Sequence, residues 1–175
     1  MRQLLILACS ARKKPSGANI PAWDLYDGVA FRVVKSVQRQ GQLSERVDVQ
    51  ILSAEHGLIS TVYGIASYER KMTPSRAMEL QSQVVGSLKE KLSSGDYQEV
   101  FIFAGNIYLE AMQPFVSWCP TPIRLTVAHG RIGQKLRQLK AWILEKNCKC
   151  MAESTLAIQG PPSRYSSANA LGSGL

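Results

Sequence analysis

Four short apolar runs, each followed by a segment with helical periodicity, constrain the fold of this chain more than any other feature. A run of four to eight apolar residues is typical of a strand buried on both faces. Strands that alternate with amphipathic helices predict a single α/β domain of the Rossmann-like kind, with a mostly parallel sheet of about four or more strands and helices on both faces. The predicted strands cover residues 3–8, 47–53, 99–104 and 122–127.

Start signals and apolar stripes locate the helices between these strands. Thr73 followed by Pro74 is a typical pair for the N-cap and first turn of a helix, which we expect to end at Gly95. Asn106 is predicted to cap a third helix over residues 107–113. The stripes expected to face the core are Leu25, Val29, Val33 and Val37 in a helix that ends at Gly41; Met78, Val85 and Leu88; and Ile132, Leu136, Leu139 and Ile143 in a helix over residues 132–146.

The length of 175 residues fits one domain, since independent domains usually have about 100–150 residues. We assign residues 1–150 to this domain. Residues 151–175 are rich in Ser, Gly, Ala and Pro without sustained periodicity, so they are predicted to form a flexible tail. No early apolar run approaches the roughly 20 residues of a membrane helix. The 4 cysteines are too few for a disulfide scaffold, so a cytoplasmic protein with free thiols is expected.

An excess of cations points to a polyanionic partner. The chain has 21 Lys and Arg against 13 Asp and Glu, which gives a net charge of +8. Clustered cations bind nucleic acids by releasing counterions from phosphates. The sequence has no amphipathic segment typical of membrane-surface binding, so DNA is the expected partner rather than a membrane. The cations predicted to contact DNA are Arg12, Lys14, Arg70, Lys71, Arg131 and Lys135.

The loops that follow the predicted strands carry most of the polar residues with chemical potential. In open parallel sheets, ligands bind beyond the carboxyl ends of the strands, where these loops converge. We therefore expect one site that combines a basic loop after the first strand with small, hydroxyl-bearing and aromatic residues from the others. The residues predicted to bind substrate are Cys9, Ser10, Lys13, Tyr26, Ser53, Tyr68, Gly105 and Tyr108.

Carboxylates next to aromatic rings suggest glycosidic-bond chemistry at this site. Glu69 follows Tyr68 in a loop of about twenty residues, and long loops without secondary structure tend to be functional. A ring can stack on a base or sugar while the acid activates water. Asp24 offers the same chemistry as a second choice, and His56 and Asn106 are candidates for hydrogen bonds to the leaving base or the water.

Each candidate also has a structural interpretation. Cys9 is consistent with a small buried residue at a strand end as well as with a nucleophile, and Asp24 with the N-cap of the first helix. A lone histidine such as His56 is more often structural. Cys148 and Cys150 are too closely spaced for a typical zinc site, so no metal is expected. The P-loop and nucleophile-elbow spacings are absent.

Six short motifs follow one another along the chain: Cys9-Ser10 with Lys13; Asp24-Leu25-Tyr26 with Phe31; Leu52-Ser53-Ala54 with His56-Gly57-Leu58; Tyr68-Glu69; Ala104-Gly105 with Tyr108; and Gly130 with Ile132-Gly133 and Leu136. In this order, over residues 3–145, they resemble a small bacterial and phage domain family. That family is distantly similar to the YaaA peroxide-stress proteins and to the accessory domain of archaeosine-forming tRNA enzymes. Two positions differ from the family pattern, because Glu55 is often Lys and Glu69 is commonly Asp there.

The resemblance implies a role at modified nucleobases, because members are associated with phage-defence DNA glycosylases that remove bulky modified bases. The leading hypothesis is therefore a DNA glycosylase that flips out a modified base and hydrolyses its bond to deoxyribose, with no cofactor and no obligatory protein partner. One alternative is a non-catalytic DNA-binding protein of the stress-response kind. Another is a transferase that exchanges bases or sugars instead of using water.

Overall fold

A five-stranded sheet forms the centre of the protein. The computed structural model describes residues 1–14, 19–120 and 122–158. The strand order is β4-β3-β1-β6-β7, and every neighbouring pair is parallel except β3 and β4. This arrangement confirms the predicted Rossmann-like α/β fold with a mostly parallel sheet. The strands of this sheet are β1 (Arg2–Ala8), β3 (Val47–Ser53), β4 (Gly57–Ser60), β6 (Tyr97–Phe103) and β7 (Arg124–Val127).

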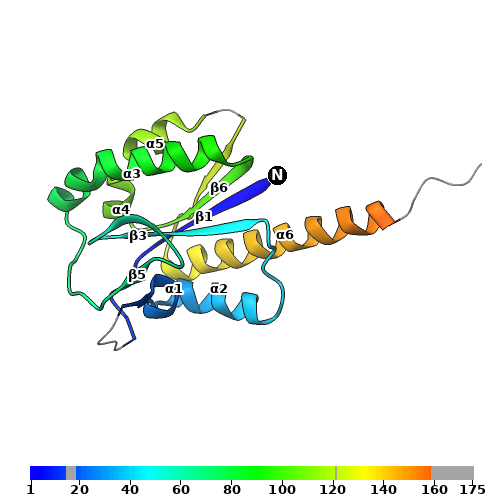
Figure 1. Ribbon diagram of the computed structural model, residues 1–175, viewed down its shortest axis with the longest axis horizontal. Helices are drawn as coiled ribbons and strands as arrows, with labels where there is room; N and C mark the ends of the chain where they lie inside the picture. The colour runs from blue at the N-terminus through cyan, green and yellow to red at the C-terminus, as the bar shows by residue number, and fades with distance from the viewer. Residues whose placement is uncertain (15–18, 121, 159–175) are drawn as a thin grey trace, which may run out of the picture.

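Helices cover both faces of this sheet (Figure 1). Side chains of β1 alternate between the two layers, with Leu5 and Leu7 in one core and Leu4 and Ile6 in the other. Because both faces are covered, the central strands are continuous apolar runs rather than alternating ones. One layer contains α1 (Ala22–Leu25), α2 (Val29–Arg39) and α6 (Ile132–Ile158), and the other contains α3 (Pro74–Ser94), α4 (Asn106–Glu110) and α5 (Gln113–Trp118).

The neighbouring strands β1 and β6 send the chain to opposite faces of the sheet. The chain after β1 continues into α1 and α2, which pack in one layer, whereas the chain after β6 enters α4 in the other layer. Such a point, where the connections diverge, opens a crevice at the carboxyl ends of the strands. This topology defines the place where a ligand site is expected.

The long loop predicted after β3 contains strands instead. Gly57–Ser60 forms β4, which pairs antiparallel with the end of β3, and Gly64–Ile65 forms β5, which pairs with β2 (Ile20–Pro21). Gly57 has a φ of +71°, a conformation that glycine adopts without strain and that makes the tight turn into β4. The prediction of a structureless loop over residues 53–73 was therefore wrong.

The helices begin where turn chemistry requires, but two of the predicted apolar stripes are out of phase. The chain turns at Gly28 before α2, and this break moves the buried face to Ala30, Phe31, Val34 and Val37 while Val29 is exposed. Thr73 caps α3 as predicted, since its hydroxyl accepts a hydrogen bond from the amide of Arg76 at 3.2 Å. The buried face of α3 consists of Ala77, Leu80, Val84 and Leu88, and Met78 is exposed.

The last two predicted helices also differ in detail. Gly105, not Asn106, is the N-cap of α4, and Asn106 is its first residue. In α6 Leu139 and Ile143 are buried as predicted, but Ile132 is exposed because it lies at the rim of the sheet. The helix continues to Ile158, beyond residue 146 and into the predicted tail, whose residues 159–175 lie outside the described part of the chain. Among the described helices, none has the length and hydropathy to cross a bilayer.

Candidate functional site

Two cavities adjoin at the carboxyl edge of the sheet, and Cys9, Ser10 and Tyr108 line both of them. The first, which we call the switch-point slot, has a volume of about 210 Å³. The second, which we call the basic cavity, has a volume of about 320 Å³, at the lower end of the range of ligand pockets. The slot is lined by Ala8, Cys9, Ser10, Gly28, Val29, Ala30, Phe31, Phe103, Ala104, Gly105 and Tyr108, and the cavity by Cys9, Ser10, Ala11, Lys13, Arg70, Lys71, Met72 and Tyr108.

The switch-point slot lies between the ends of β1 and β6 and the first turns of α2 and α4. Its described lining contains no charged side chain, and Phe31 and Phe103 contribute aromatic walls. The N-caps of both helices are glycines, Gly28 and Gly105, so the first amides of α2 and α4 are not capped by a side chain. The slot therefore combines apolar walls with backbone donors at one end.

Gly28 permits the close approach of two segments in the slot wall. A Cβ at this position would lie 2.5 Å from the Cβ of Ser10, far inside van der Waals contact. The Ser10 hydroxyl donates to the carbonyl of Arg12 at 2.6 Å, which fixes the turn of the first loop. Residue 28 must therefore be glycine for the loop after β1 to pack against the start of α2.

The basic cavity is lined by three cations, Lys13, Arg70 and Lys71, and by no carboxylate among its described lining residues. The Lys13 ammonium lies 4.3 Å from the ring centroid of Tyr68, a cation–π contact that orients it. Arg70 forms an ion pair with Glu55 at 3.3 Å, which holds its guanidinium beside the cavity. An anionic group such as a phosphate is the ligand that this lining favours.

Beneath the cavities, three hydroxyl groups from separate elements form a hydrogen-bonded chain. The Tyr68 hydroxyl lies 2.6 Å from that of Tyr26 and 2.8 Å from that of Ser53. The Ser53 oxygen also accepts the amides of Glu55 and His56, each at 3.1 Å. Because two donors occupy the acceptor sites of Ser53, its own hydrogen is donated to Tyr68. This chain ties the end of β3 to the segment that carries Arg70 and Lys71.

The phenols near Cys9 stay neutral at physiological pH. Burial raises the pKa of Tyr26 to about 12, and it also raises the pKa values of Tyr68 and Tyr108 above the ordinary range. The Tyr108 hydroxyl lies 3.1 Å from the Cys9 sulfur. The partition between slot and cavity thus presents a thiol and an uncharged phenol to any ligand that crosses it.

Burial contradicts the substrate role predicted for Tyr26 and Ser53, whereas that of Tyr68 stays a prediction. Tyr26 and Ser53 are both fully buried, so neither can stack on or bind a ligand directly. Tyr68 is partly buried, with its hydroxyl in the chain and its ring between Lys13 and His56. These residues support the site from below, whereas Cys9, Ser10, Lys13, Gly105 and Tyr108 line it.

The predicted catalytic carboxylates do not line either cavity. Glu69 lies between Tyr68 and Arg70, and its exposed side chain makes no hydrogen bond or ion pair within the described residues. Asp24 is the third residue of α1, so it is not an N-cap, and it lines a different cavity. Glu69 is therefore an exposed residue next in sequence to Arg70, which lines the basic cavity, while Asp24 is separated from the candidate site.

His56 and Asn106 lie around the site rather than in its lining. The His56 ring contacts Tyr68 edge-on with 5.6 Å between centroids, and its other neighbour is Tyr63 at 5.9 Å. These contacts match the structural interpretation of this histidine. Asn106 is exposed at the first position of α4, next to Gly105 in the slot lining.

The cations predicted to contact DNA fall into two groups. Lys14, Lys71 and Arg131 are exposed and available to a phosphate backbone. The others are engaged within the protein: Arg12 forms an ion pair with Asp27 at 3.2 Å, Arg70 forms one with Glu55 at 3.3 Å, and Lys135 donates to the carbonyl of Ala104 at 2.8 Å. Lys135 thus fixes the junction between β6 and α4 and is not a free surface cation as predicted.

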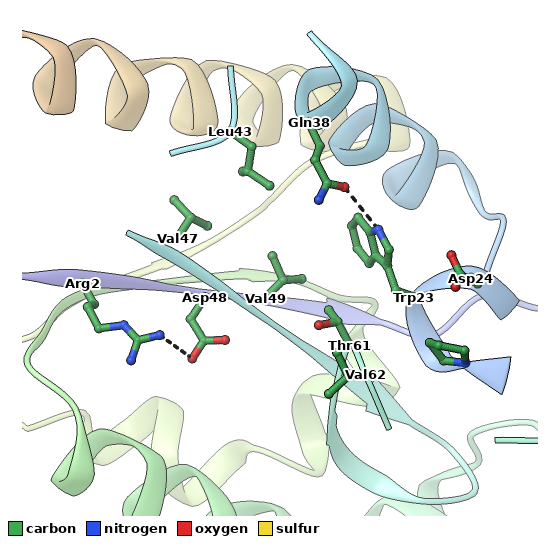
Figure 2. Close-up of a pocket in the computed structure, with 11 residues that line it drawn as sticks. Arg2, Trp23, Asp24, Gln38, Leu43, Val47, Asp48, Val49, Thr61 and Val62 are labelled. Carbon is green, nitrogen blue, oxygen red and sulfur yellow. Dashed lines mark hydrogen bonds and ion pairs between the residues drawn. The ribbon is translucent and has the colours of Figure 1, made fainter. Parts of the chain in front are cut away.

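A third cavity, of about 470 Å³, lies away from this edge (Figure 2). It is bordered by the first half of β3, with Val47, Asp48 and Val49, and by the side of α2 with Gln38. Figure 2 shows Trp23 directed toward Gln38, to which its indole donates at 3.2 Å. The Asp48 carboxylate is held by Arg2, Lys91 and Tyr97. Gln50 donates to the other carboxylate oxygen at 3.2 Å, so Asp48 is engaged by four side chains of the protein.

Several residues at the site were missed by sequence analysis. Asp27 pairs with Arg32 at 2.7 Å as well as with Arg12, and the Arg32 hydrogen bonds hold the pKa of that carboxyl below its usual range. Arg76 donates to the carbonyls of Ala54 and Glu55 at 2.9 and 2.7 Å and clamps the turn after β3. The Asp27-Gly28 pair before a predicted helix was a sequence signal that could have pointed to Asp27. No local sequence signal points to Arg76. Phe103, Gly28 and Met72 are among the lining residues that were also missed.

A metal site finds no support in the described geometry. Among the side chains that the structure describes, no group of three or more His, Cys, Asp or Glu residues lies close enough to hold an ion. Cys9 and Cys119, the two cysteines with described side chains, are free thiols.

The comparisons with known proteins identify the class of this domain without assigning an activity. Residues 4–141 match the model of a family described as a family of unknown function, DUF6884, and the chain belongs to that family. No curated protein matches the sequence. The resemblance to YaaA-like proteins and DNA glycosylases therefore stays a prediction.

One solved structure is similar to this fold at low identity. It is described as the crystal structure of AF0587, a protein of unknown function, with 14% identity and a TM-score of 0.48. The match covers 81% of this chain, which spans 44% of the length of that chain.

Proposed function

We propose that this protein binds DNA at the carboxyl edge of its sheet and hydrolyses the N-glycosidic bond of a modified base that it has taken out of the duplex. The observation that carries this proposal is the basic cavity, in which three cations and no described carboxylate surround a space next to an uncharged slot. A phosphate of the DNA backbone is the anion expected in such a cavity. Flipping a base costs a few kcal/mol, which contacts in the site can offset.

The reaction we propose needs one carboxylate and one water. Glu69, exposed beside Tyr68 and Arg70, accepts a proton from water as the oxygen attacks C1′ of the deoxyribose. The bond between C1′ and the base nitrogen breaks, its electron pair leaves with the base, and a proton returns to that nitrogen. Cations beside the phosphate hold the substrate in position for the attack.

A non-catalytic DNA-binding protein is the second candidate. It is favoured by a specific observation, since no Asp or Glu lines either cavity in the described chain. DNA binding without catalysis requires only the cations of this edge. Both candidate functions therefore use the same surface, and an assay of base release distinguishes them.

An abasic-site assay on unmodified and phage-modified duplexes, with products identified by mass, tests the proposal. We expect wild-type protein to release a modified base and Glu69→Gln to lower turnover by about 10²-fold, because the variant keeps size and polarity but loses the base. DNA affinity should be retained or slightly higher, since a negative charge near phosphates is removed.

Asp24→Asn is the matched control, because it makes the same chemical change on an exposed carboxylate that lines a different cavity. It should turn over at the wild-type rate. Intact modified DNA with the wild-type protein would overturn hydrolysis and favour the binding candidate. Normal turnover by Glu69→Gln would remove this carboxylate from the mechanism.

A further inference from the structure

We propose that the two cavities hold the two ends of a single nucleotide, with the base in the switch-point slot, the phosphate in the basic cavity and the sugar across the partition. This inference rests on the proposed function and names the unit that the site recognises. It makes the ligand a nucleotide with both an intact base and a phosphate, rather than a stretch of phosphate backbone alone.

The distribution of charged side chains indicates which end of the nucleotide each cavity holds. A charged group buried in the slot would lack a partner, because the described lining contains no charged side chain. Phe31 and Phe103 are 1% and 8% exposed and border the slot from the core, so the slot offers an apolar surface to an uncharged group such as a nucleobase. Across the partition, Lys13, Arg70 and Lys71 offer cations to an anion.

The shared residues explain why one molecule can span both spaces. Cys9, Ser10 and Tyr108 line both cavities, so the two spaces meet at these side chains. The Ser10 hydroxyl hydrogen is already donated to Arg12, which leaves its oxygen as an acceptor. Cys9 and Tyr108 share one hydrogen bond, so one of their two hydrogens is left to be donated to a ring or ester oxygen of the deoxyribose that joins base to phosphate.

Two exposed residues, each the first of its helix, provide a test variant and a control variant for the slot. Val29 is the first residue of α2, is 52% exposed and lines the slot. Ile132 is the first residue of α6, is 57% exposed and lines neither cavity in the described chain. Val29→Trp therefore narrows the mouth of the slot, whereas Ile132→Trp adds the same ring elsewhere on the rim.

Two lysines provide the corresponding pair for the basic cavity. Lys13 lines the cavity, whereas Lys140 is exposed on α6 and lines neither cavity in the described chain. Lys13→Ala removes a cation from the proposed phosphate position. Lys140→Ala makes the same change in net charge without touching the lining.

Calorimetric titration of the full chain with thymidine, thymidine 5′-monophosphate, thymidine 3′-monophosphate and inorganic phosphate tests the inference. We expect at least one monophosphate to bind more tightly than thymidine or phosphate. Val29→Trp should weaken the monophosphate by about tenfold or more and leave phosphate unchanged, and Lys13→Ala should weaken both by about tenfold. The two control variants should stay within about twofold, and the two monophosphates identify which sugar oxygen carries the phosphate.

Equal affinity for phosphate and both monophosphates would overturn the inference. Equal losses from Val29→Trp and Ile132→Trp, or from Lys13→Ala and Lys140→Ala, would also overturn it. The outcome is separable from that of the proposed function. Base release from DNA by a protein whose monophosphate affinity is unaffected by Val29→Trp would overturn only the two-cavity assignment. Monophosphate binding with the expected losses, but no abasic product, would overturn only hydrolysis.

Discussion

Ser53 holds together the hydrogen-bonded hydroxyl groups beneath the site. Its side chain is fully buried and connects two backbone amides, those of Glu55 and His56, with the hydroxyl of Tyr68. Without Ser53 the two amides would lose this partner, whereas the Tyr68 hydroxyl would keep its contact with Tyr26. A buried polar atom left unpaired costs about 1–3 kcal/mol. The same residue therefore stabilises the turn after β3 and sets the position of Tyr68 beneath Lys13.

Ser53→Ala should lower the free energy of unfolding by about 2 kcal/mol or more, because one substitution leaves several polar groups unpaired. Urea denaturation monitored by circular dichroism measures this change. Ser75→Ala, on the exposed first turn of α3, is the control and should shift stability by less than about 0.5 kcal/mol. Equal stability of the two variants would show that water replaces the Ser53 hydroxyl.

Single residues of the site were predictable only where local sequence carries the signal. Cys9, Ser10 and Lys13 directly follow a strand, and the carboxyl-end rule places such residues at the edge. The burial of Tyr26 was not predictable, because its hydroxyl contacts that of Tyr68, which is distant in sequence. The chain passes through β4 and β5 before it brings Tyr68 to this contact. A residue whose partner comes from a remote segment gives no periodic pattern of its own.

At the scale of elements, strands were easier to predict than helix faces. β3 has the predicted bounds, and β1 and β6 differ from them by only one or two residues, because a strand buried on both faces is apolar at every position. A helix face depends on where the helix starts, so the turn at Gly28 was enough to move the buried stripe of α2 to Phe31 and Val34. β4 was missed because four residues are too few for a reliable alternating pattern.

A buried ion pair fixes α6 against the sheet. The Lys146 ammonium lies 2.6 Å from the Glu99 carboxylate, with side chains that are 4% and 11% exposed, and the indole of Trp142 donates to the same carboxylate at 2.8 Å. Lys146→Met should lower the free energy of unfolding by about 3–5 kcal/mol, because it leaves a buried charge without its counterion. Thermal and urea denaturation measure the loss.

Deletion of residues 151–175 tests whether the end of α6 contributes to stability. The deletion keeps the buried side chains of this helix, which are Leu139, Trp142, Ile143 and Lys146. The free energy of unfolding should change by less than about 0.5 kcal/mol, as for surface changes. The double variant with Glu99→Gln and Lys146→Met should recover part of the single-variant loss, because neither partner is then charged. A deletion as harmful as Lys146→Met would mean that the segment after residue 150 packs on the domain.

At the scale of the whole molecule, the net charge of +8 matters through its distribution. A uniform excess of cations would attract DNA without fixing where it lies, whereas cations around one cavity concentrate counterion release there. Lys13 and Lys71 line the basic cavity, while Arg137 and Lys140 are exposed on α6 and line neither cavity in the described chain. The two pairs carry equal charge. A comparison of the two double alanine variants therefore tests the position of the cations rather than the total charge of the protein.

The double variant Lys13→Ala with Lys71→Ala should reduce the slope of log affinity for duplex DNA against log salt concentration by about 1.8, since each lost phosphate contact contributes about 0.9. The pair Arg137→Ala and Lys140→Ala lowers the net charge equally, but its slope should stay close to that of the wild type. Fluorescence anisotropy at several salt concentrations measures both slopes with unmodified duplex, so the result does not depend on finding a modified base. Equal slopes for the two double variants would mean that DNA responds only to the net charge of the protein. A larger change with the α6 pair would move the DNA surface away from the basic cavity to the side of the helix.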